Sequence, residues 1–273
     1  MSRQTTATMV IDPQARIVDK KTWKDYTLLR LESSEIASSA QPGQFIMVRV
    51  TQSSQPLLRR PFSIHSRDKK NVEIFFKISG LGTAILSQKK AGELLDILGP
   101  LGKGFSKNES LKGKHVFLIG GGRGIAPLCF LAQELRSSEA SVKILYGGRT
   151  EEDIPLREKF EENGLDIFCS TDDGSFGFKG LVTELLEKEL RRLKPACIFA
   201  CGPELMMKKI SRIARSKKIP AQFSLESVMG CGFGACWGCV RRIKKNGVTT
   251  WTKICQEGPV FRGDDIIWQN EEK

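Results

Sequence analysis

Four cysteines near the C-terminal end of the chain form the pattern with the most definite chemistry. Cys231, Cys236 and Cys239 follow the spacing C-x4-C-x2-C, and Cys255 comes later, in the segment KICQEG. Thiolate ligands in plant-type [2Fe-2S] proteins have this spacing, whereas structural zinc sites usually combine two separated C-x2-C pairs. Glycines beside and between these cysteines let the backbone curl so that its N–H groups face a cluster. They are Gly230, Gly232, Gly234 and Gly238. We predict a [2Fe-2S] cluster on these cysteines, with zinc or unliganded thiols as the alternatives.

A glycine-rich loop is the second pattern with chemical meaning. The sequence LIGGGRGIAPL follows an apolar run and precedes a helical pattern, a setting in which backbone N–H groups and the helix dipole bind a pyrophosphate. The loop departs from G-x-G-x-x-G because Ile125 stands in place of the third glycine. A plain strand-to-helix turn is therefore the alternative.

Two other apolar runs end in residues suited to a nucleotide site. The segment STDDGSFG contains Asp172 and Asp173, and the segment ACGP contains Cys201 and Gly202. Because ligands of open α/β sheets bind beyond the carboxyl ends of the strands, we expect these segments to join the glycine loop in one site. The acidic residue that would bind an adenine ribose is absent from YGGRT, which offers Arg149 instead.

A third constellation lies in the N-terminal part of the chain. The segment LRRPFSIHS combines an arginine with a hydroxyl, and FFKISGLGT combines a lysine with a glycine turn. Arg60 could neutralise a pyrophosphate, Ser63 could hydrogen-bond a flavin ring, and backbone N–H groups of Gly82 and Thr83 could bind phosphate. Without a cofactor, the same residues would be a cationic strand edge followed by a glycine turn.

The hydrophobic pattern divides the chain into three parts that would position these residues. Residues 10 to about 107 alternate short β-like runs with glycine and proline turns, which is typical of an antiparallel β-barrel or sandwich. Nearly continuous apolar runs alternate with helical patterns further on, which predicts a parallel α/β domain; the runs cover residues 115–120, 142–147, 166–171 and 197–201. We assign residues 1–112, 113–222 and 223–273 to a barrel, an α/β and a cysteine domain.

Composition narrows the class of protein. The chain has 273 residues, of which 40% are apolar and 27% charged, as expected for a packed globular protein of two or three domains. No apolar run is long enough for a membrane span, and the start MSRQTTATMV lacks a signal-peptide core, so we expect a cytoplasmic protein. In a reducing compartment, we expect three other cysteines to be small buried hydrophobic residues: Cys129, Cys169 and Cys197. The cysteine domain has too few apolar residues for a core of its own and needs a staple such as a metal.

Together these segments resemble the ferredoxin-NADP reductase superfamily. The order is R-P-F-S, G-x-G-T, G-P-L-G-K-G-F, G-G-G-R-G-I-A-P, T-D-D-G-S, C-G-P and the four-cysteine loop. The cysteine domain is most similar to the electron-transfer subunits of class 1B dihydroorotate dehydrogenase, dihydroorotate dehydrogenase B (NAD+). The match spans residues 10 to about 265, and its cysteine spacing is the specific part. Subunits of NADPH-ferredoxin transhydrogenases, sulfide dehydrogenases and some hydrogenases share much of it.

The resemblance implies a set of cofactor-binding residues. It places FAD on the barrel, at Arg60, Pro61, Phe62, Ser63, Phe75, Phe76, Lys77, Gly82 and Thr83. It places a nicotinamide dinucleotide on the α/β domain, at Gly121, Gly122, Gly124, Asp173, Cys201 and Gly202. Ser63 and Cys201 are the candidates at the junction between flavin and nicotinamide. Arg123 departs from the family pattern, which has a small or apolar residue there, and Arg149 could meet a 2′-phosphate; we expect NAD, with NADP as the alternative.

The implied activity is electron transfer with a partner. A hydride carries two electrons and a [2Fe-2S] cluster accepts one, so FAD is needed to convert between them. In the family resembled, which serves pyrimidine biosynthesis, electrons from dihydroorotate leave an FMN subunit and pass through the cluster to FAD and NAD+. This chain has no obvious dihydroorotate site of its own. We therefore expect a flavin and iron-sulfur oxidoreductase component that works in a hetero-oligomer with an FMN-containing catalytic subunit.

Two other functions compete with this interpretation. One is a stand-alone NAD(P)H reductase, which would need no catalytic subunit. The other is a zinc-stapled basic module that binds nucleic acid, suggested by the net charge of +12 and by the basic run from Arg241 to Lys245. No nucleic-acid recognition motif accompanies that charge, and bound cluster and pyrophosphate would lower it to about +8. We expect the remaining charge to be a solvated surface or a docking surface for an acidic protein.

Overall fold

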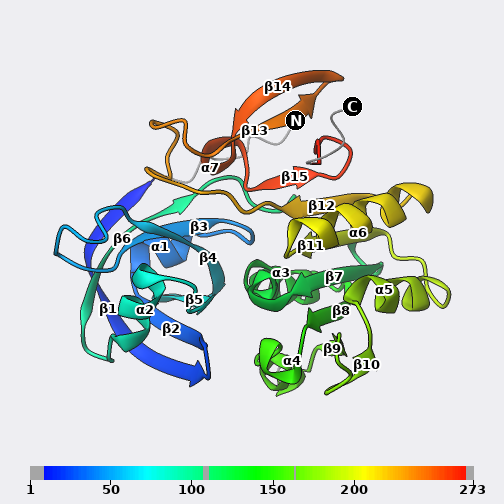
Figure 1. Cartoon of the computed structure of the whole chain (residues 1–273), viewed down its shortest axis with the longest axis horizontal. Helices are drawn as coiled ribbons and strands as arrows, with labels where there is room; N and C mark the ends of the chain where they lie inside the picture. Colours follow the sequence, from blue (N-terminus) through cyan, green and yellow to red (C-terminus); the bar gives the residue numbers. More distant parts are fainter. Residues whose placement is uncertain (1–8, 107–110, 163, 269–273) are drawn as a thin grey trace.

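Six antiparallel strands close into a barrel in the N-terminal part of the chain (Figure 1). The computed structural model describes residues 9–106, 111–162 and 164–268. The strands are β1 (Val10–Trp23), β2 (Tyr26–Glu32), β3 (Phe45–Arg49), β4 (Arg60–Arg67), β5 (Asn71–Lys77) and β6 (Leu94–Leu101), in the order β1-β2-β5-β4-β3-β6. Two short helices, α1 (Ser34–Ser39) and α2 (Leu81–Gln88), connect them. The expected antiparallel barrel is confirmed.

Strand β3 separates two hydrophobic cores. Successive side chains of a strand point to opposite faces. Ile46 and Val48 accordingly belong to the core inside the barrel, whereas Phe45 and Met47 belong to a core shared with the sheet and the C-terminal segment. One face of β3 therefore connects the barrel to the rest of the molecule.

The α/β part is a seven-stranded sheet in the order β10-β9-β8-β7-β11-β12-β15. All neighbouring strands are parallel except β12 and β15, which pair antiparallel. The strands are β7 (His115–Gly121), β8 (Ser141–Gly148), β9 (Asp166–Thr171), β10 (Phe178–Lys179), β11 (Cys197–Cys201), β12 (Ala221–Ser224) and β15 (Val260–Arg262). The apolar runs predicted as strands correspond to β7, β8, β9 and β11. The sequence analysis did not identify β10, β12 and β15, because they are short.

Helices cover both faces of this sheet. On the barrel side lie α3 (Ala126–Ser137) and α4 (Arg157–Glu162), and on the other side lie α5 (Val182–Leu190) and α6 (Glu204–Ser216). The short helices η2 (Gly122–Ile125) and η3 (Glu151–Asp153) follow β7 and β8. Helix α3 packs against the barrel, because its apolar side chains share a core with Tyr26 and Phe75. None of the helices in the described ranges is long and apolar enough to cross a membrane.

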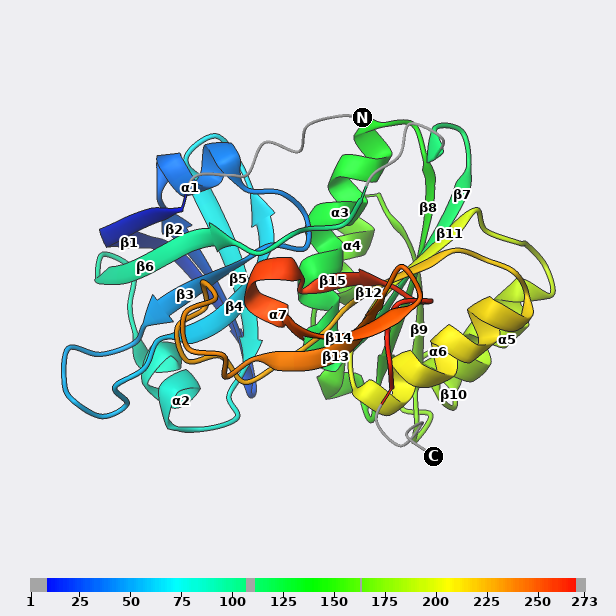
Figure 2. The same ribbon diagram turned by 90° about the horizontal axis from the view of Figure 1, so that it is seen from above.

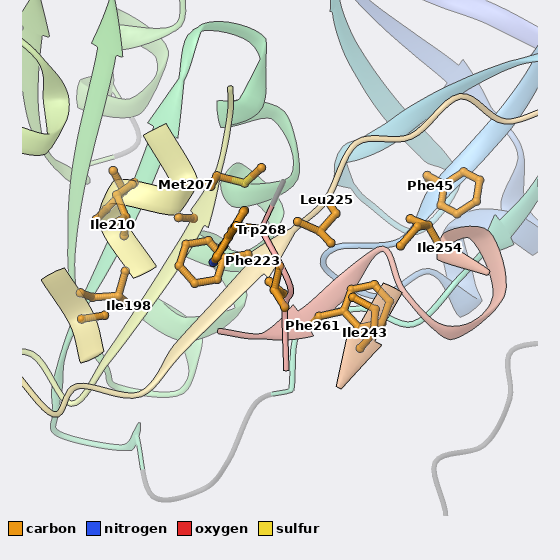
Figure 3. Close-up of a cluster of buried hydrophobic side chains, with 14 of the residues drawn as sticks. Phe45, Ile198, Met207, Ile210, Phe223, Leu225, Ile243, Ile254, Phe261 and Trp268 are labelled. Carbon is orange, nitrogen blue, oxygen red and sulfur yellow. The ribbon is translucent and has the colours of Figure 1, made fainter. Parts of the chain in front are cut away.

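The C-terminal segment lies across the junction of barrel and sheet (Figure 2). It contains the hairpin β13 (Val240–Lys245) and β14 (Val248–Lys253), then α7 (Ile254–Glu257) and β15. Its apolar side chains enter the core that Phe45 and Phe223 also share (Figure 3); they are Ile243, Ile254, Phe261, Ile266 and Trp268. The predicted boundary after residue 222 falls inside β12, and residues 1–8 and 269–273 of the predicted domains lie outside the described residues.

Trp268 provides a test of this shared core. Its side chain is 1% exposed and packs edge-on against Phe223, with ring centroids 5.4 Å apart. We expect Trp268→Ala to lower the free energy of unfolding by about 3–5 kcal/mol, measured by urea denaturation of the cofactor-loaded protein. Trp251, which is 63% exposed, is the matched control, and Trp251→Ala should cost about 0.5 kcal/mol or less. Equal effects of the two substitutions would contradict the packing described.

Candidate functional site

A cavity of about 270 Å³ lies between the barrel and the sheet. The barrel lines it with residues 60–63 of β4, residues 75–77 of β5 and Thr83 of α2. The sheet side contributes Gly124 and Cys201. The end of β12 and the residues after it also line the cavity; they are Ser224, Leu225, Glu226, Ser227 and Met229. The structure thus brings most of the barrel residues predicted for FAD to one cavity.

One edge of this first cavity is suited to a pyrophosphate. Arg60 lies over the start of α2, where a Cβ on Gly82 would come within 2.9 Å of the Arg60 Nε atom. The Thr83 hydroxyl accepts hydrogen bonds from the backbone N–H groups of Ser79 (2.9 Å) and Gly80 (3.1 Å) and so shapes the turn. The first N–H groups of a helix have no partner inside it, and here they lie beside a guanidinium. A guanidinium and a helix N-terminus together favour a bound anion.

The lining of the first cavity also includes aromatic side chains, those of Phe62, Phe75 and Phe76. Phe75 stacks on Tyr26 with centroids 5.4 Å apart and an interplanar angle of 9°. Phe62 packs against Phe76 at 5.2 Å. Flat apolar side chains together with an anion-binding edge fit a flavin dinucleotide, whose ring system is planar and whose linker is charged.

A second cavity of about 740 Å³ lies at the carboxyl ends of the parallel strands. Its lining includes residues at four strand ends: Gly121 and Gly122 at the end of β7, Gly148 and Arg149 at the end of β8, Asp172 after β9, and Gly202 after β11. Gly124 belongs to the first cavity instead. A side chain at position 124 would clash with the end of β11, because a Cβ on Gly124 would lie 2.4 Å from the Cys201 carbonyl oxygen. This size and position fit a dinucleotide.

The structure places the two aspartates after β9 differently. Asp172 lines the second cavity, whereas Asp173, the residue predicted at the site, is not part of the lining. The Asp173 carboxylate accepts hydrogen bonds from the Ser175 backbone N–H (2.9 Å) and hydroxyl (2.7 Å), which lower its pKa. Asp173 therefore stabilises its own turn. The DD pair alone gives no indication of which carboxylate faces the ligand.

A buried carboxylate connects the barrel to the sheet beside the second cavity. Asp153 accepts hydrogen bonds from the Tyr26 hydroxyl (2.8 Å) and the Lys77 ammonium (2.7 Å), both on the barrel, and from Arg149 Nε (3.2 Å). Burial alone would raise the pKa of Asp153, but these hydrogen bonds dominate and lower it to about 2. Arg149, considered above for a 2′-phosphate, is engaged by this carboxylate.

The four predicted cluster cysteines lie together as two pairs. The Cys236 backbone N–H donates to Cys231 Sγ (3.4 Å), and the Cys255 backbone N–H donates to Cys239 Sγ (3.4 Å). Burial would raise the pKa of Cys231, but hydrogen bonds led by the Cys236 N–H lower it to about 6. Across residues 9–106, 111–162 and 164–268, no three His, Cys, Asp or Glu side chains are arranged to hold one metal ion. Two pairs fit a cluster with two irons, each of which takes two thiolates.

The cluster loop packs directly on the face of β3 that leads to the first cavity. A Cβ on Gly232, whose φ is +85°, would lie 2.4 Å from the Met47 side chain, so only glycine allows this contact. Met47 and Phe45 point to the same side of β3, and Phe45 lines the first cavity. Met229, two residues before Cys231, lines it as well. The cluster loop and the first cavity are therefore in contact through side chains.

Sequence reasoning missed the residues at the end of β12 and just after it. Ser224, Glu226 and Met229 line the first cavity, but the sequence analysis assigned them to the cysteine domain. Tyr26, which lines the second cavity, was missed because it lies on a barrel strand. Had residues 221–224 been predicted as a strand, Ser224, Glu226 and Met229 would have been candidates. The carboxyl end of this strand lies beside those of the other parallel strands, where ligands bind.

Three protein families match the three parts of the chain. The family described as oxidoreductase FAD-binding domain matches residues 14–105, and the oxidoreductase NAD-binding domain matches residues 118–212. The iron-sulfur cluster binding domain of dihydroorotate dehydrogenase B matches residues 226–267, which contain all four cluster cysteines. FAD-, NAD- and iron-sulfur-binding domains are therefore present in this chain. The family match assigns the four cysteines to an iron-sulfur domain rather than to the alternative zinc site.

Whole-chain comparisons agree with these domain matches. The electron transfer subunit of dihydroorotate dehydrogenase B (NAD(+)) from Desulforamulus reducens is 41% identical over 88% of this chain and 92% of its own. The subunit of that name from Geobacillus thermodenitrificans is 36% identical over 92% and 95%. A solved structure of an NADH-dependent reduced ferredoxin-NADP oxidoreductase superposes with a TM-score of 0.81 at 30% identity, covering 94% of this chain and 91% of that chain. A ferredoxin reductase of carbazole 1,9a-dioxygenase, with a TM-score of 0.65 at 21% identity, shares the fold.

Asp153 yields a prediction about stability and pH. Because its pKa falls from 3.8 to about 2 on folding, its contribution is fully present above about pH 4 and is lost as pH falls from 4 towards 2. We expect Asp153→Asn to lower the free energy of unfolding by about 2 kcal/mol, equally at pH 8 and pH 5. The exposed Glu152→Gln is the control and should have a much smaller effect. A loss that changes between pH 8 and pH 5 would contradict the assignment.

Cys236 yields a prediction about the cluster. Its side chain is exposed, so Cys236→Ala should fold, but it removes one of the paired thiolates. We expect the variant to lose the visible absorption of the cluster and to keep that of the flavin. Cys129→Ala, which changes a buried cysteine in the α3 core, should keep both. Full cluster absorption in Cys236→Ala would refute the ligand assignment.

Proposed function

The chain belongs to the family of electron-transfer subunits of dihydroorotate dehydrogenase B, and we propose that it passes electrons between a dihydroorotate-oxidising FMN subunit and NAD+. It is a flavin and iron-sulfur, NAD-linked oxidoreductase component. The observation that carries the proposal is the contact series from cluster loop to first cavity to second cavity. Met47 and Phe45 make the first link. Lys77, Arg123 and Glu226, which line both cavities, make the second.

The proposed cofactor positions follow from the cavities. Residues 60–63, residues 75–77 and Thr83 would hold FAD in the first cavity. The glycine loop and the ends of β8, β9 and β11 would hold the nicotinamide dinucleotide in the second. Cys231 with Cys236, and Cys239 with Cys255, would each bind one iron. When bound, FAD accepts two electrons as hydride and exchanges single electrons with the cluster.

The protein's own part in this chemistry is to fix the relative position of the two cavities and to keep the Cys201 thiol uncharged. The hydrogen bonds of Asp153 with Tyr26 and Lys77 hold the barrel against the sheet, so the two cavities keep their relative position. Burial raises the pKa of the Cys201 thiol, which therefore stays neutral beside the junction of the cavities. We propose NAD rather than NADP, because the relatives are named for NAD(+).

The partner is proposed from the family and from the surface of the cluster loop. Cys236 is exposed, and the neighbouring Phe233 and Trp237 are 47% and 58% exposed. An apolar rim around a cluster supports docking of a catalytic subunit there, in a hetero-oligomer. None of the eight cysteines, all of which lie in the described ranges, is part of a disulfide. A reducing compartment preserves thiols and the thiolate ligands of a cluster, so we propose a cytoplasmic location.

Reconstitution tests the proposed function. The loaded chain is mixed anaerobically with the FMN-containing dihydroorotate dehydrogenase chain of the same cell, and NADH formation from dihydroorotate and NAD+ is followed by absorbance. We expect NADH only when both chains are present, and loss of that activity in Cys236→Ala, which should still be bleached by NADH. NADH formation without this chain would contradict the proposal. So would a requirement for ferredoxin in place of dihydroorotate, which would favour a transhydrogenase.

A further inference from the structure

An ion pair lies where the two cavities meet. Arg123 Nη2 is 2.9 Å from Glu226 Oε2, and Arg123 Nε is 3.5 Å from Glu226 Oε1. Both residues line both cavities, as does Lys77. The pair therefore stands at the place where a nicotinamide from the second cavity would approach a flavin in the first.

The sheet order explains how residues so distant in sequence meet there. Arg123 is in η2 directly after β7, and Glu226 is two residues beyond β12. Strand β11 lies between β7 and β12, so the ion pair spans the carboxyl end of β11 at Cys201. Both charges act on the Cys201 thiol, whose pKa burial raises, Glu226 raises further and Arg123 lowers.

Arg123 directly follows Gly121 and Gly122 in the turn between β7 and α3, and all three residues line the second cavity. Backbone N–H groups in a turn between a strand and a helix can bind a phosphate. The Arg123 guanidinium adds a positive charge to this turn, and the Glu226 carboxylate pairs with that charge. The two side chains are 48% and 51% exposed, and ion pairs of that exposure are weak enough to exchange partners.

We propose that Arg123 exchanges Glu226 for the pyrophosphate of the incoming nicotinamide dinucleotide, so that Glu226 lowers dinucleotide affinity by competing for the guanidinium. A guanidinium binds a phosphate through two parallel hydrogen bonds, as it does a carboxylate. Arg123 is then a positioning residue for the dinucleotide, and Glu226 is its competitor. This inference rests on the proposed function in one respect, that the second cavity takes a dinucleotide.

A double-mutant cycle with ADP-ribose tests the exchange. ADP-ribose carries the pyrophosphate but no nicotinamide, so its binding to the loaded full chain, measured by calorimetry, reports affinity without hydride transfer. We expect Glu226→Gln to tighten ADP-ribose binding about two- to five-fold and Arg123→Gln to weaken it. Mere charge repulsion would make Glu226→Gln equally effective in both backgrounds. Competition predicts a smaller gain when Arg123→Gln is already present.

The controls separate this inference from the function on which it rests. Glu32→Gln breaks an ion pair with Arg16 on the barrel, away from both cavities, and should leave ADP-ribose affinity unchanged. Flavin and cluster absorption verify that each variant is folded and loaded. Equal tightening in both backgrounds, no tightening, or weakening by Glu226→Gln would overturn the exchange alone. Failure of the unchanged chain to bind ADP-ribose would contradict the dinucleotide site and the exchange together.

Discussion

The packing of the C-terminal segment against both other parts of the chain is the constraint on which the structure depends. Residues 225–268 have too few apolar side chains for a separate core. Ile243, Ile254 and Trp268 are buried in a core that they share with Phe45 of the barrel and Phe223 of the sheet. The same contacts that make the segment stable place its cysteine loop on β3. Burial of apolar surface and positioning of the cluster therefore have one cause.

Close backbone approach is what brings the sites together. Glycine at position 232 lets the cluster loop contact Met47, and glycine at position 124 lets the turn after β7 contact the carbonyl of Cys201. Either contact would fail with a Cβ atom present. The Asp153 hydrogen bonds add a polar fixation between barrel and sheet. Two cavities and a cluster loop that arise in different parts of the sequence thus become neighbours.

Sequence patterns predicted the elements with long, regular signals. The β structure of the N-terminal part, four strands of the sheet and the chemistry of the cysteine loop follow from local residue types and spacing, but the local pattern was typical of a barrel and of a sandwich alike. The short strand β12 and edge strand β15 did not, because their pairing is decided by neighbours distant in sequence. For the same reason the ion pair of Arg123 with Glu226 was invisible in the sequence. The choice of Asp172 over Asp173 depends on a hydrogen bond within one turn, which composition does not reveal.

The central claim is that the first cavity, filled by flavin, is the necessary link between nicotinamide and cluster. Rapid anaerobic mixing with NADH, followed by freeze-quench electron paramagnetic resonance, tests it most directly. The sample pair is the complete protein and the same protein stripped of flavin with its cluster intact. We expect the signal of the reduced cluster to appear after flavin bleaching in the complete protein and not to appear in the stripped protein. Reduction of the cluster at the same rate in both samples would contradict the account.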